Sequence, residues 1–401
     1  MHAVLITGPP PGHRGAASWS YGRDTRMQES TETMSRRSLL IAGGAAATTV
    51  ATTGGASALA GEETEPQGSR SGDDAGRAKI DVHHHVTAPA WVDWAEREGL
   101  VRREELPWWA RWDADSALAL MDRVGIATAV LNPTMQDRYR SAAQAREGLS
   151  VLFEALADLM AAHPGRFAVL GPAVLDHPDV TTWALHHAFD ELGAVGVSAK
   201  ANYNGVYLGD PSYDRFLAQL DERAAVLFTH PLDLPSGPPG VPTVPGIPNF
   251  MCDFLLDTTR AAVNMIRTGT LDRHPHVSVV LPHAGGFLPA IATRMQAFGS
   301  FCTPPLDAAR VRDHLHRFYY DTAGPSAPSG TLVATAGADR ILFGTDWPAA
   351  SADIITGFTV PAVETDPVFT DRQRRGIYRD NALRLMPTLR RDLMPAPVGD
   401  R

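Results

Sequence analysis

An eightfold alternation of short apolar runs with longer amphipathic segments constrains the fold of this 401-residue chain more than any other feature. Short runs rich in Val, Ile and Phe predict strands, and apolar residues at helical spacing predict helices. The predicted strands are residues 79–85, 126–131, 167–174, 195–200, 224–230, 277–283, 318–322 and 340–346. The predicted helices are residues 116–124, 141–163, 181–192, 213–223, 258–268, 287–298, 308–316, 332–336 and 371–386.

Strands that alternate with helices favour a parallel sheet, and eight repeats favour its closure into a (β/α)₈ TIM barrel. The alternative, a doubly wound open sheet, usually has a glycine-rich phosphate turn after its first strand, and this chain has none there. Two insertions follow predicted strands: residues 88–112, with five tryptophans, and the Pro/Gly-rich residues 232–256. Both insertions should therefore lie on the carboxyl face, where barrel enzymes have their sites.

The first predicted strand ends in three consecutive histidines, His83, His84 and His85. Residues two apart in a strand share a face, so His83 and His85 point the same way and His84 points away. A solvated or tag-like histidine run is the alternative, but a tag would not lie within an Ile-Asp-Val strand. Two imidazoles on one face predict a site for a divalent metal.

Three more titratable residues lie at predicted strand ends: His230, His283 and Asp346. A single buried histidine at such a place is more often a hydrogen-bonded core residue than a ligand. Several on one rim would each need a polar partner, and a metal satisfies several at once. His83, His85, His230 and Asp346 together offer three nitrogens and one oxygen, a set that suits zinc.

Composition narrows the classes of function. The net charge of −9 argues against a nucleic-acid partner, because phosphate binding requires a basic surface. Only two cysteines occur, Cys252 and Cys302, so the chain has no disulfide framework and no thiolate metal site.

Residues 34–60 are typical of a Tat export signal. Arg36 and Arg37 precede an Ala/Gly/Thr-rich apolar stretch, and Ala58-Leu59-Ala60 is a small-x-small cleavage site. The alternative is a membrane anchor, but the stretch is short and too rich in small residues to partition strongly into lipid. Cleavage would leave a protein without a membrane anchor, with Gly61 as its first residue.

The rest of the chain divides around one barrel. Residues 1–33 are interpreted as a mis-called extension, with translation starting at Met34 or Met27. Residues 61–78 are a polar linker, which we expect to be disordered. The barrel then covers residues 79–387, and residues 388–401 form a tail.

Five motifs give the chain a resemblance to the amidohydrolase superfamily. Within it, the sequence resembles the branch of aminocarboxymuconate-semialdehyde decarboxylase and the aromatic-acid decarboxylases. In chain order, over residues 79–387, the motifs are Asp81-x-His83-x-His85, Phe228-x-His230-Pro231, Pro282-His283-Ala284-Gly285-Gly286, Gly344-Thr345-Asp346-Trp347-Pro348 and Asn381-Ala382-x-Arg384-Leu385. Residues 202–211 and 254–260 look most like the 6-methylsalicylate decarboxylase group.

The resemblance implies one divalent metal, zinc or alternatively manganese, held by His83, His85, His230 and Asp346. His283 is then the general acid/base, and Asp346 shares proton transfer. The implied activity is decarboxylation of a small hydroxy-aromatic or unsaturated carboxylic acid, in a protein that forms a homodimer. A lysine at the position of Lys200 is carboxylated and bridges two metals in some relatives, but this branch favours one metal.

Three residues are candidate substrate contacts. Arg260 would bind the substrate carboxylate, although a surface helix arginine is an equal alternative. Trp109, next to Trp108, would line an aromatic pocket or pack as a lid over the barrel mouth. Asn202 lies in the matched stretch 202–211.

Two other functions stay open. A metal-dependent hydrolase of a lactone or amide would use the same ligands, so the metal motif does not choose between hydrolysis and decarboxylation. A metal-storing or structural barrel is the third alternative, and His283, a base beside a complete ligand set, argues against it. Export is in tension with a decarboxylase of this branch, since such enzymes are usually thought of as intracellular.

Overall fold

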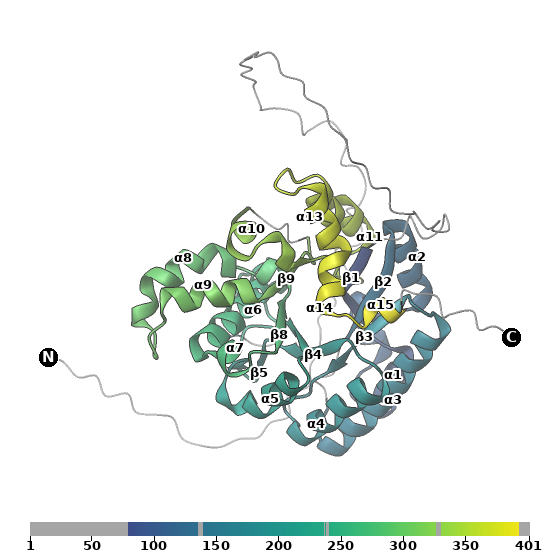
Figure 1. Cartoon of the computed structure of the whole chain (residues 1–401). Coiled ribbons are helices and arrows are strands. Elements are labelled where there is room, and N and C mark those ends of the chain that lie inside the picture. The colour runs from purple at the N-terminus through teal and green to yellow at the C-terminus, as the bar shows by residue number, and fades with distance from the viewer. Residues whose placement is uncertain (1–78, 135–138, 236, 238–239, 326–329, 393–401) are drawn as a thin grey trace, which may run out of the picture. The chain divides into compact units, whose positions relative to one another are not determined.

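The computed structural model describes residues 79–392 except 135–138, 236, 238–239 and 326–329 (Figure 1). The predictions for the extension 1–33, the signal 34–60, the linker 61–78 and residues 393–401 lie outside the described residues. No described helix is both long and apolar enough to cross a membrane.

Eight strands form one parallel sheet, in which each strand pairs with the next one along the sheet. A separate two-stranded hairpin, β5 and β6, follows the fourth strand. In sheet order the eight strands are β1 (Lys79–Val86), β2 (Ile126–Pro133), β3 (Phe167–Pro172), β4 (Gly196–Lys200), β7 (Val226–His230), β8 (Ser278–Leu281), β9 (Tyr319–Asp321) and β10 (Ile341–Leu342). The hairpin strands are β5 (Asn202–Tyr203) and β6 (Val206–Tyr207).

Hydrogen bonds between β1 and the segment after β10 close the sheet. The Val82 amide donates to the Phe343 carbonyl at 2.9 Å, and the Asp346 amide donates to the His83 carbonyl at 2.8 Å. The His85 amide donates to the Trp347 carbonyl at 2.6 Å. The first and last strands are therefore neighbours, and the predicted (β/α)₈ barrel is confirmed.

A buried carboxylate, Asp81, reinforces this closure. It accepts hydrogen bonds from the amides of His83 at 3.1 Å and Thr345 at 2.9 Å, from the Thr345 hydroxyl, and from Nδ1 of His84 at 3.0 Å. Asp81 is fully buried, so each of these bonds replaces a water contact that the carboxylate loses on folding. The same bonds fix the backbone on both sides of the closure.

The helices lie around the outside of the sheet (Figure 1). They are α1 (Pro89–Arg97), α2 (Ala114–Val124), α3 (Ala142–Ala162), α4 (Pro178–His186), α5 (Asp214–Glu222), α6 (Asn249–Thr268), α7 (Thr270–Arg273), α8 (Leu288–Phe298), α9 (Ala308–Arg317), α10 (Gly330–Ala336), α11 (Ala352–Ile354), α12 (Val360–Glu364), α13 (Asp371–Arg375), α14 (Asn381–Leu385) and α15 (Leu389–Asp392). Their buried apolar faces and the outward-facing strand residues form the larger core.

A second, smaller core fills the barrel interior. Inward-facing strand residues such as Ile80, Val130 and Phe228 form it, and Met386 and Leu389 of the C-terminal segment join the same cluster. The ring of His83 packs edge-on against Phe228, with ring centroids 5.0 Å apart. The apolar interior therefore supports the histidine layer directly.

The boundaries of several predicted elements are wrong. Helix α6 begins at Asn249, nine residues before the predicted start at residue 258. Its buried face carries Asp253, Asp257 and Thr258, so the apolar periodicity that predicts a helix is missing there. Helix α1 was not predicted within the insertion 88–112.

Strand and helix ends also differ from prediction. Strand β10 ends at Leu342, and residues 343–346 bond to β1 instead of continuing the ladder with β9. The predicted helices 181–192 and 371–386 are each interrupted by a π-helical turn, at His187–Glu191 and Gly376–Asp380. Such turns leave no clear trace in hydrophobic periodicity.

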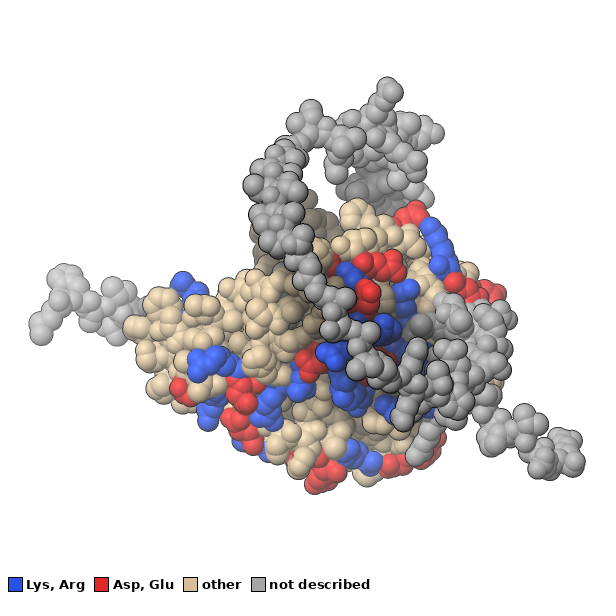
Figure 2. All heavy atoms as spheres, turned by 45° about the horizontal axis from the view of Figure 1, so that its top comes forward, with Lys and Arg blue, Asp and Glu red and all other residues tan. Residues whose placement is uncertain are grey.

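Positive and negative side chains are interspersed on the face drawn in Figure 2. Nucleic-acid binding proteins usually gather Lys and Arg along one face or helix. Together with the net charge of −9, this distribution gives no support to a nucleic-acid partner.

The closure predicts a stability effect for Asp81→Asn. The substitution replaces an acceptor oxygen by an amide donor that faces other donors, so we expect a loss of about 2–4 kcal/mol of unfolding free energy. The control is Asp339→Asn, because Asp339 is exposed and, within the described part of the chain, its side chain makes only a long ion pair with Arg340. Thermal unfolding followed by circular dichroism measures both, and equal Tm values for the two variants would refute the role of Asp81.

Candidate metal and catalytic site

Four predicted ligands meet at the carboxyl end of the barrel. His83 and His85 come from β1, His230 from the end of β7, and Asp346 from the segment after β10. One ligand atom of each lies within 4.8 Å of those of the other three. Parallel strands end at one edge of a sheet, which is why residues so far apart in the chain converge here.

The distances define a tight cluster. Nε2 of His83 lies 3.3 Å from Nε2 of His85 and 3.2 Å from Oδ1 of Asp346. The same Asp346 oxygen lies 3.0 Å from Nε2 of His85. The ring of His230 has its centroid 4.8 Å from that of His85 and 5.4 Å from that of His83.

The hydrogen bonds of the outer ring nitrogens determine which nitrogens face inward. Nδ1 of His83 donates to Oδ2 of Asp321 at 2.8 Å, and Nδ1 of His230 donates to the Pro231 carbonyl at 2.9 Å. In its neutral form, each of these two imidazoles presents an Nε2 lone pair to the cluster. The imidazole nitrogens and the Asp346 carboxylate oxygen then face one another as electron-pair donors, and a single proton cannot bridge all of them. A divalent cation can, so this set of donor atoms fits a metal.

The charges of the side chains agree with this fit. Burial lowers the pKa of His85 and lowers that of His230 well below its usual range. Burial alone would raise the pKa of Asp346, but the histidines around it, His83 foremost, hold it well below its usual range. Neutral imidazole and ionised carboxylate are the forms that bind metals.

His83 differs from the other two histidines. Burial lowers its pKa, but the carboxylates of Asp321 and Asp346 outweigh burial and raise that pKa to about 10. The proton on His83 is thus held between two carboxylates, and a cation bound at Nε2 competes with it.

Sequence reasoning missed Asp321. This buried carboxylate at the end of β9 orients His83 and also accepts the backbone amides of His283 at 2.8 Å and Ala323 at 3.0 Å. The available signal was its place at the end of the predicted strand 318–322, the same place in a strand as His230 and His283.

His283, the predicted acid/base, lies beside the four ligands. Its Nε2 is 3.6 Å from Oδ2 of Asp346, and its ring centroid is 5.3 Å from that of His83. His283 and Asp346 both have positive φ, 55° and 66°, which is costly for residues with a Cβ. A Cβ added at Gly324 would lie 2.8 Å from Cδ2 of His283, so this loop fits closely against the ring.

The predicted substrate contacts lie outside the four-residue cluster. The Asn202 amide donates to Oδ1 and Oδ2 of Asp257 at 2.9 and 3.1 Å, and its oxygen accepts the Gly205 amide at 3.1 Å. Its side chain is therefore occupied by protein groups. Arg260 is half-buried on α6, one turn after Asp257.

Lys200 ends β4, in register with His230 on β7. Its ammonium lies 5.6 Å from the ring centroid of Tyr203, and burial lowers its pKa to about 8. The alternative of a carboxylated Lys200 that bridges two metals stays a prediction.

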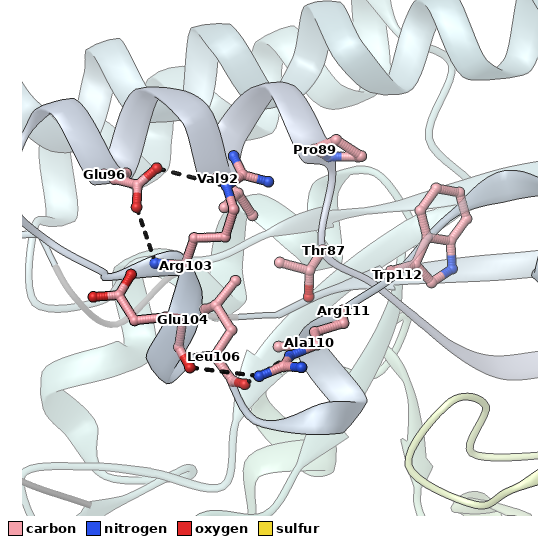
Figure 3. Close-up of a pocket in the computed structure, with 10 residues that line it drawn as sticks. All are labelled: Thr87, Pro89, Val92, Glu96, Arg103, Glu104, Leu106, Ala110, Arg111 and Trp112. Atoms are coloured by element: carbon pink, nitrogen blue, oxygen red, sulfur yellow. Dashed lines mark hydrogen bonds and ion pairs between the residues drawn. The ribbon is translucent and has the colours of Figure 1, made fainter.

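Two cavities border the tryptophan-rich segment. The larger, about 750 Å³, lies beside the end of β1 between α1 and residues 103–112 (Figure 3), and the smaller, about 410 Å³, lies between Trp108 and Trp347. None of their lining residues is a cluster residue or His283, so the converging side chains rather than cavity size locate the chemistry. Trp109 packs half-buried against the core, and Trp108 is 58% exposed.

Comparison with known proteins gives three findings. The model of the amidohydrolase family matches residues 80–388. The decarboxylase yanB of Aspergillus niger is 30% identical over 342 residues, which cover 80% of this chain and 89% of that protein. The 6-methylsalicylic acid decarboxylase acuB of Aspergillus aculeatus is 30% identical over 331 residues, which cover 78% of this chain and 97% of that protein.

Among solved structures, a dihydroxybenzoic acid decarboxylase from Polaromonas with bound manganese and the inhibitor 2-nitroresorcinol has the same fold. The TM-score is 0.65 at 22% identity, over 80% of this chain and all of that one. At this identity the likeness concerns the fold alone.

The contact between Asp321 and His83 predicts that Asp321→Asn weakens metal binding about 10- to 100-fold, because the ring loses the carboxylate that fixes its tautomer. Titration with Zn²⁺ and with Mn²⁺ against a chelating dye measures the affinity. Asp179→Asn is the control, since that carboxylate on α4 is 91% exposed and belongs to neither of the two groups of side chains that could hold a metal. Unchanged affinity in Asp321→Asn would show that Asp321 does not position the ligand.

Proposed function

The chain belongs to the amidohydrolase family, and from this membership and the geometry of the cluster we propose that it is a metal-dependent decarboxylase of small hydroxy-aromatic carboxylic acids. The observation that carries the proposal is the place of His283. A histidine that is not one of the four clustered donors lies 3.6 Å from Asp346, beside a set that fits a divalent cation.

In this proposal His83, His85, His230 and Asp346 hold one divalent metal. Three nitrogens and one oxygen favour zinc, and manganese is the alternative. When bound, the metal supplies Lewis-acid stabilisation of negative charge on substrate oxygens.

His283 has a distinct task in this chemistry. Decarboxylation of an o-hydroxy aromatic acid begins with a proton at the ring carbon that bears the carboxylate, which interrupts the aromatic system. The bond to the carboxylate then breaks, its electron pair restores aromaticity, and CO₂ leaves. His283 donates the proton, its Nε2 lies 3.6 Å from the carboxylate of Asp346, and the hydrogen bond from the His283 amide to Asp321 fixes the backbone.

The substrate we propose is 6-methylsalicylate or a close relative. Support comes from the name of the relative acuB, 6-methylsalicylic acid decarboxylase, and from Arg260, a cation on α6 one turn after Asp257, which bonds to the segment after β7. A lactone or amide hydrolase would use the same donor set, so the assay must include both kinds of substrate.

The assay compares metal-loaded protein with 6-methylsalicylate, 2,6-dihydroxybenzoate and a panel of lactones. CO₂ release from the acids is expected, and lactone opening without CO₂ release would replace decarboxylation by hydrolysis. His283→Asn should lower CO₂ release at least 100-fold while metal content stays the same. His276→Asn is the control, because His276 lies at the opposite end of β8 and its side chain is 67% exposed. Full activity in His283→Asn would reject its assigned role.

Export through the Tat pathway is a further part of the proposal, supported by Arg36, Arg37 and the small residues before Gly61. Expression in a host with a Tat system should release a protein that begins at Gly61, and Arg36→Lys with Arg37→Lys should retain the precursor in the cells. Intact-mass spectrometry decides: a secreted protein with its signal attached, or unchanged export of the double variant, would contradict the prediction. The homodimer stays a prediction.

A further inference from the structure

One face of α6 packs against the segment that follows β4. Asp257, Arg260 and Asn264 are spaced three and four residues apart, so they lie along one side of the helix. The first and last of the three contact residues 202–208. Arg260 therefore lies between two points at which the helix is fixed to the β5–β6 hairpin.

Asp257 joins two loops at the carboxyl face. Its carboxylate accepts both hydrogen bonds from the Asn202 amide, at 2.9 and 3.1 Å, and accepts the Leu232 amide at 2.9 Å. Asn202 follows Lys200 at the end of β4, and Leu232 follows His230 at the end of β7. The fully buried Asp257 thus fixes the position of α6 next to one of the four clustered histidines.

The other end of the contact fixes the hairpin. The Asn264 amide donates to the carbonyls of Tyr207 at 3.3 Å and Leu208 at 3.0 Å. Gly209 has φ of 90°, and a Cβ there would lie 2.9 Å from the Cα of Met265. The backbone of Tyr207 is therefore held tightly against α6.

Two polar side chains between these fixed points, Tyr207 and Arg260, lack a full set of hydrogen-bond partners in the described part of the chain. The phenol oxygen of Tyr207 is buried and forms no hydrogen bond of good geometry among the described residues. Burial raises the pKa of Tyr207 to about 12, and Arg260 and Asp257 both lie close enough to pair with its hydroxyl. Asp257 already accepts from two nitrogens, the side-chain amide of Asn202 and the backbone amide of Leu232, so it cannot also satisfy the five N–H donors of Arg260. Arg260 and Tyr207 are thus neighbouring donors with capacity for another acceptor.

We propose that Arg260 and Tyr207 form a paired donor subsite for the carboxylate of an aromatic acid, and that Asp257 is the positioning residue that holds the pair. The inference rests on the proposed function for the identity of the acid. A guanidinium fork and a phenol hydroxyl together match the planar, two-oxygen geometry of a carboxylate. Tyr207 is then a determinant of specificity for acids over neutral phenols.

Two ligands that differ only in the carboxylate test the inference. Binding of 6-methylsalicylate and of 3-methylphenol to the metal-loaded protein is followed by stopped-flow tryptophan fluorescence, before turnover. Tyr207→Phe and Asp257→Asn should each bind 6-methylsalicylate about 10-fold more weakly or worse. Binding of 3-methylphenol and metal content should stay as in the unaltered protein.

Asp253→Asn is the matched control on the same helix. Asp253 lies one turn before Asp257 and bonds to Thr243 instead of the hairpin, so it should not change the preference for the acid. Equal losses for both ligands in Asp257→Asn would indicate a merely structural role and overturn the proposal. Unchanged affinity for the acid in Tyr207→Phe would overturn the subsite.

The outcomes for subsite and function are separable. If the unaltered protein releases no CO₂ but its affinity for 6-methylsalicylate depends on Tyr207 and Asp257, the subsite stands and the decarboxylase proposal falls. If CO₂ is released and the variants keep full affinity, the subsite falls alone. Failure of the unaltered protein to bind 6-methylsalicylate overturns the inference.

Discussion

The pairing of β1 with the segment after β10 is the interaction on which the rest of the structure depends. It closes the barrel, and it also brings the two β1 histidines to the carboxylate of Asp346, since the Asp346 amide itself bonds to the His83 carbonyl. Asp81 holds both sides of this closure with its buried carboxylate. The fold and the candidate metal site therefore share one set of backbone hydrogen bonds, and the closure places Asp346 against His83 and His85.

The four clustered residues and the barrel could be predicted from sequence because both follow from local rules. Alternation along β1 places His83 and His85 on one face, and the common direction of parallel strands places His230, His283 and Asp346 at the same edge. No knowledge of long-range contacts is required for either step. Strand β10 ends four residues before Asp346, yet Asp346 still reaches the cluster because its backbone bonds to β1.

Residues whose role depends on a distant partner could not be predicted in the same way. Asp321 acts through His83, which lies 238 positions away in the chain, and nothing local to β9 shows that contact. Asn202 was predicted to contact the substrate, but its amide donates to Asp257. Asp257 lies in the first part of α6, where buried polar residues interrupt the apolar periodicity, so that part of the helix was not predicted. Buried polar networks of this kind are set by tertiary packing, so single-sequence patterns do not reveal them.

The four clustered donors and the groups that would act on the substrate come from different parts of the fold, and this difference explains how one fold can support different reactions. The four clustered donors come from β1, β7 and the closure after β10, and the same donors would serve a hydrolase or a decarboxylase. The groups that differ between these chemistries are the proton donor and the contacts to the substrate. In the function proposed above, these groups are His283, whose backbone amide bonds to Asp321, and the α6 face with Arg260, which Asp257 fixes to the segment after β7. Asp321 accepts the backbone amide of His283 itself, whereas Asp257 fixes the helix that carries Arg260 by accepting the Leu232 amide. Under the proposed function, the choice of reaction would therefore depend on these buried carboxylates and the groups they place, because the ligand set is common to both reactions.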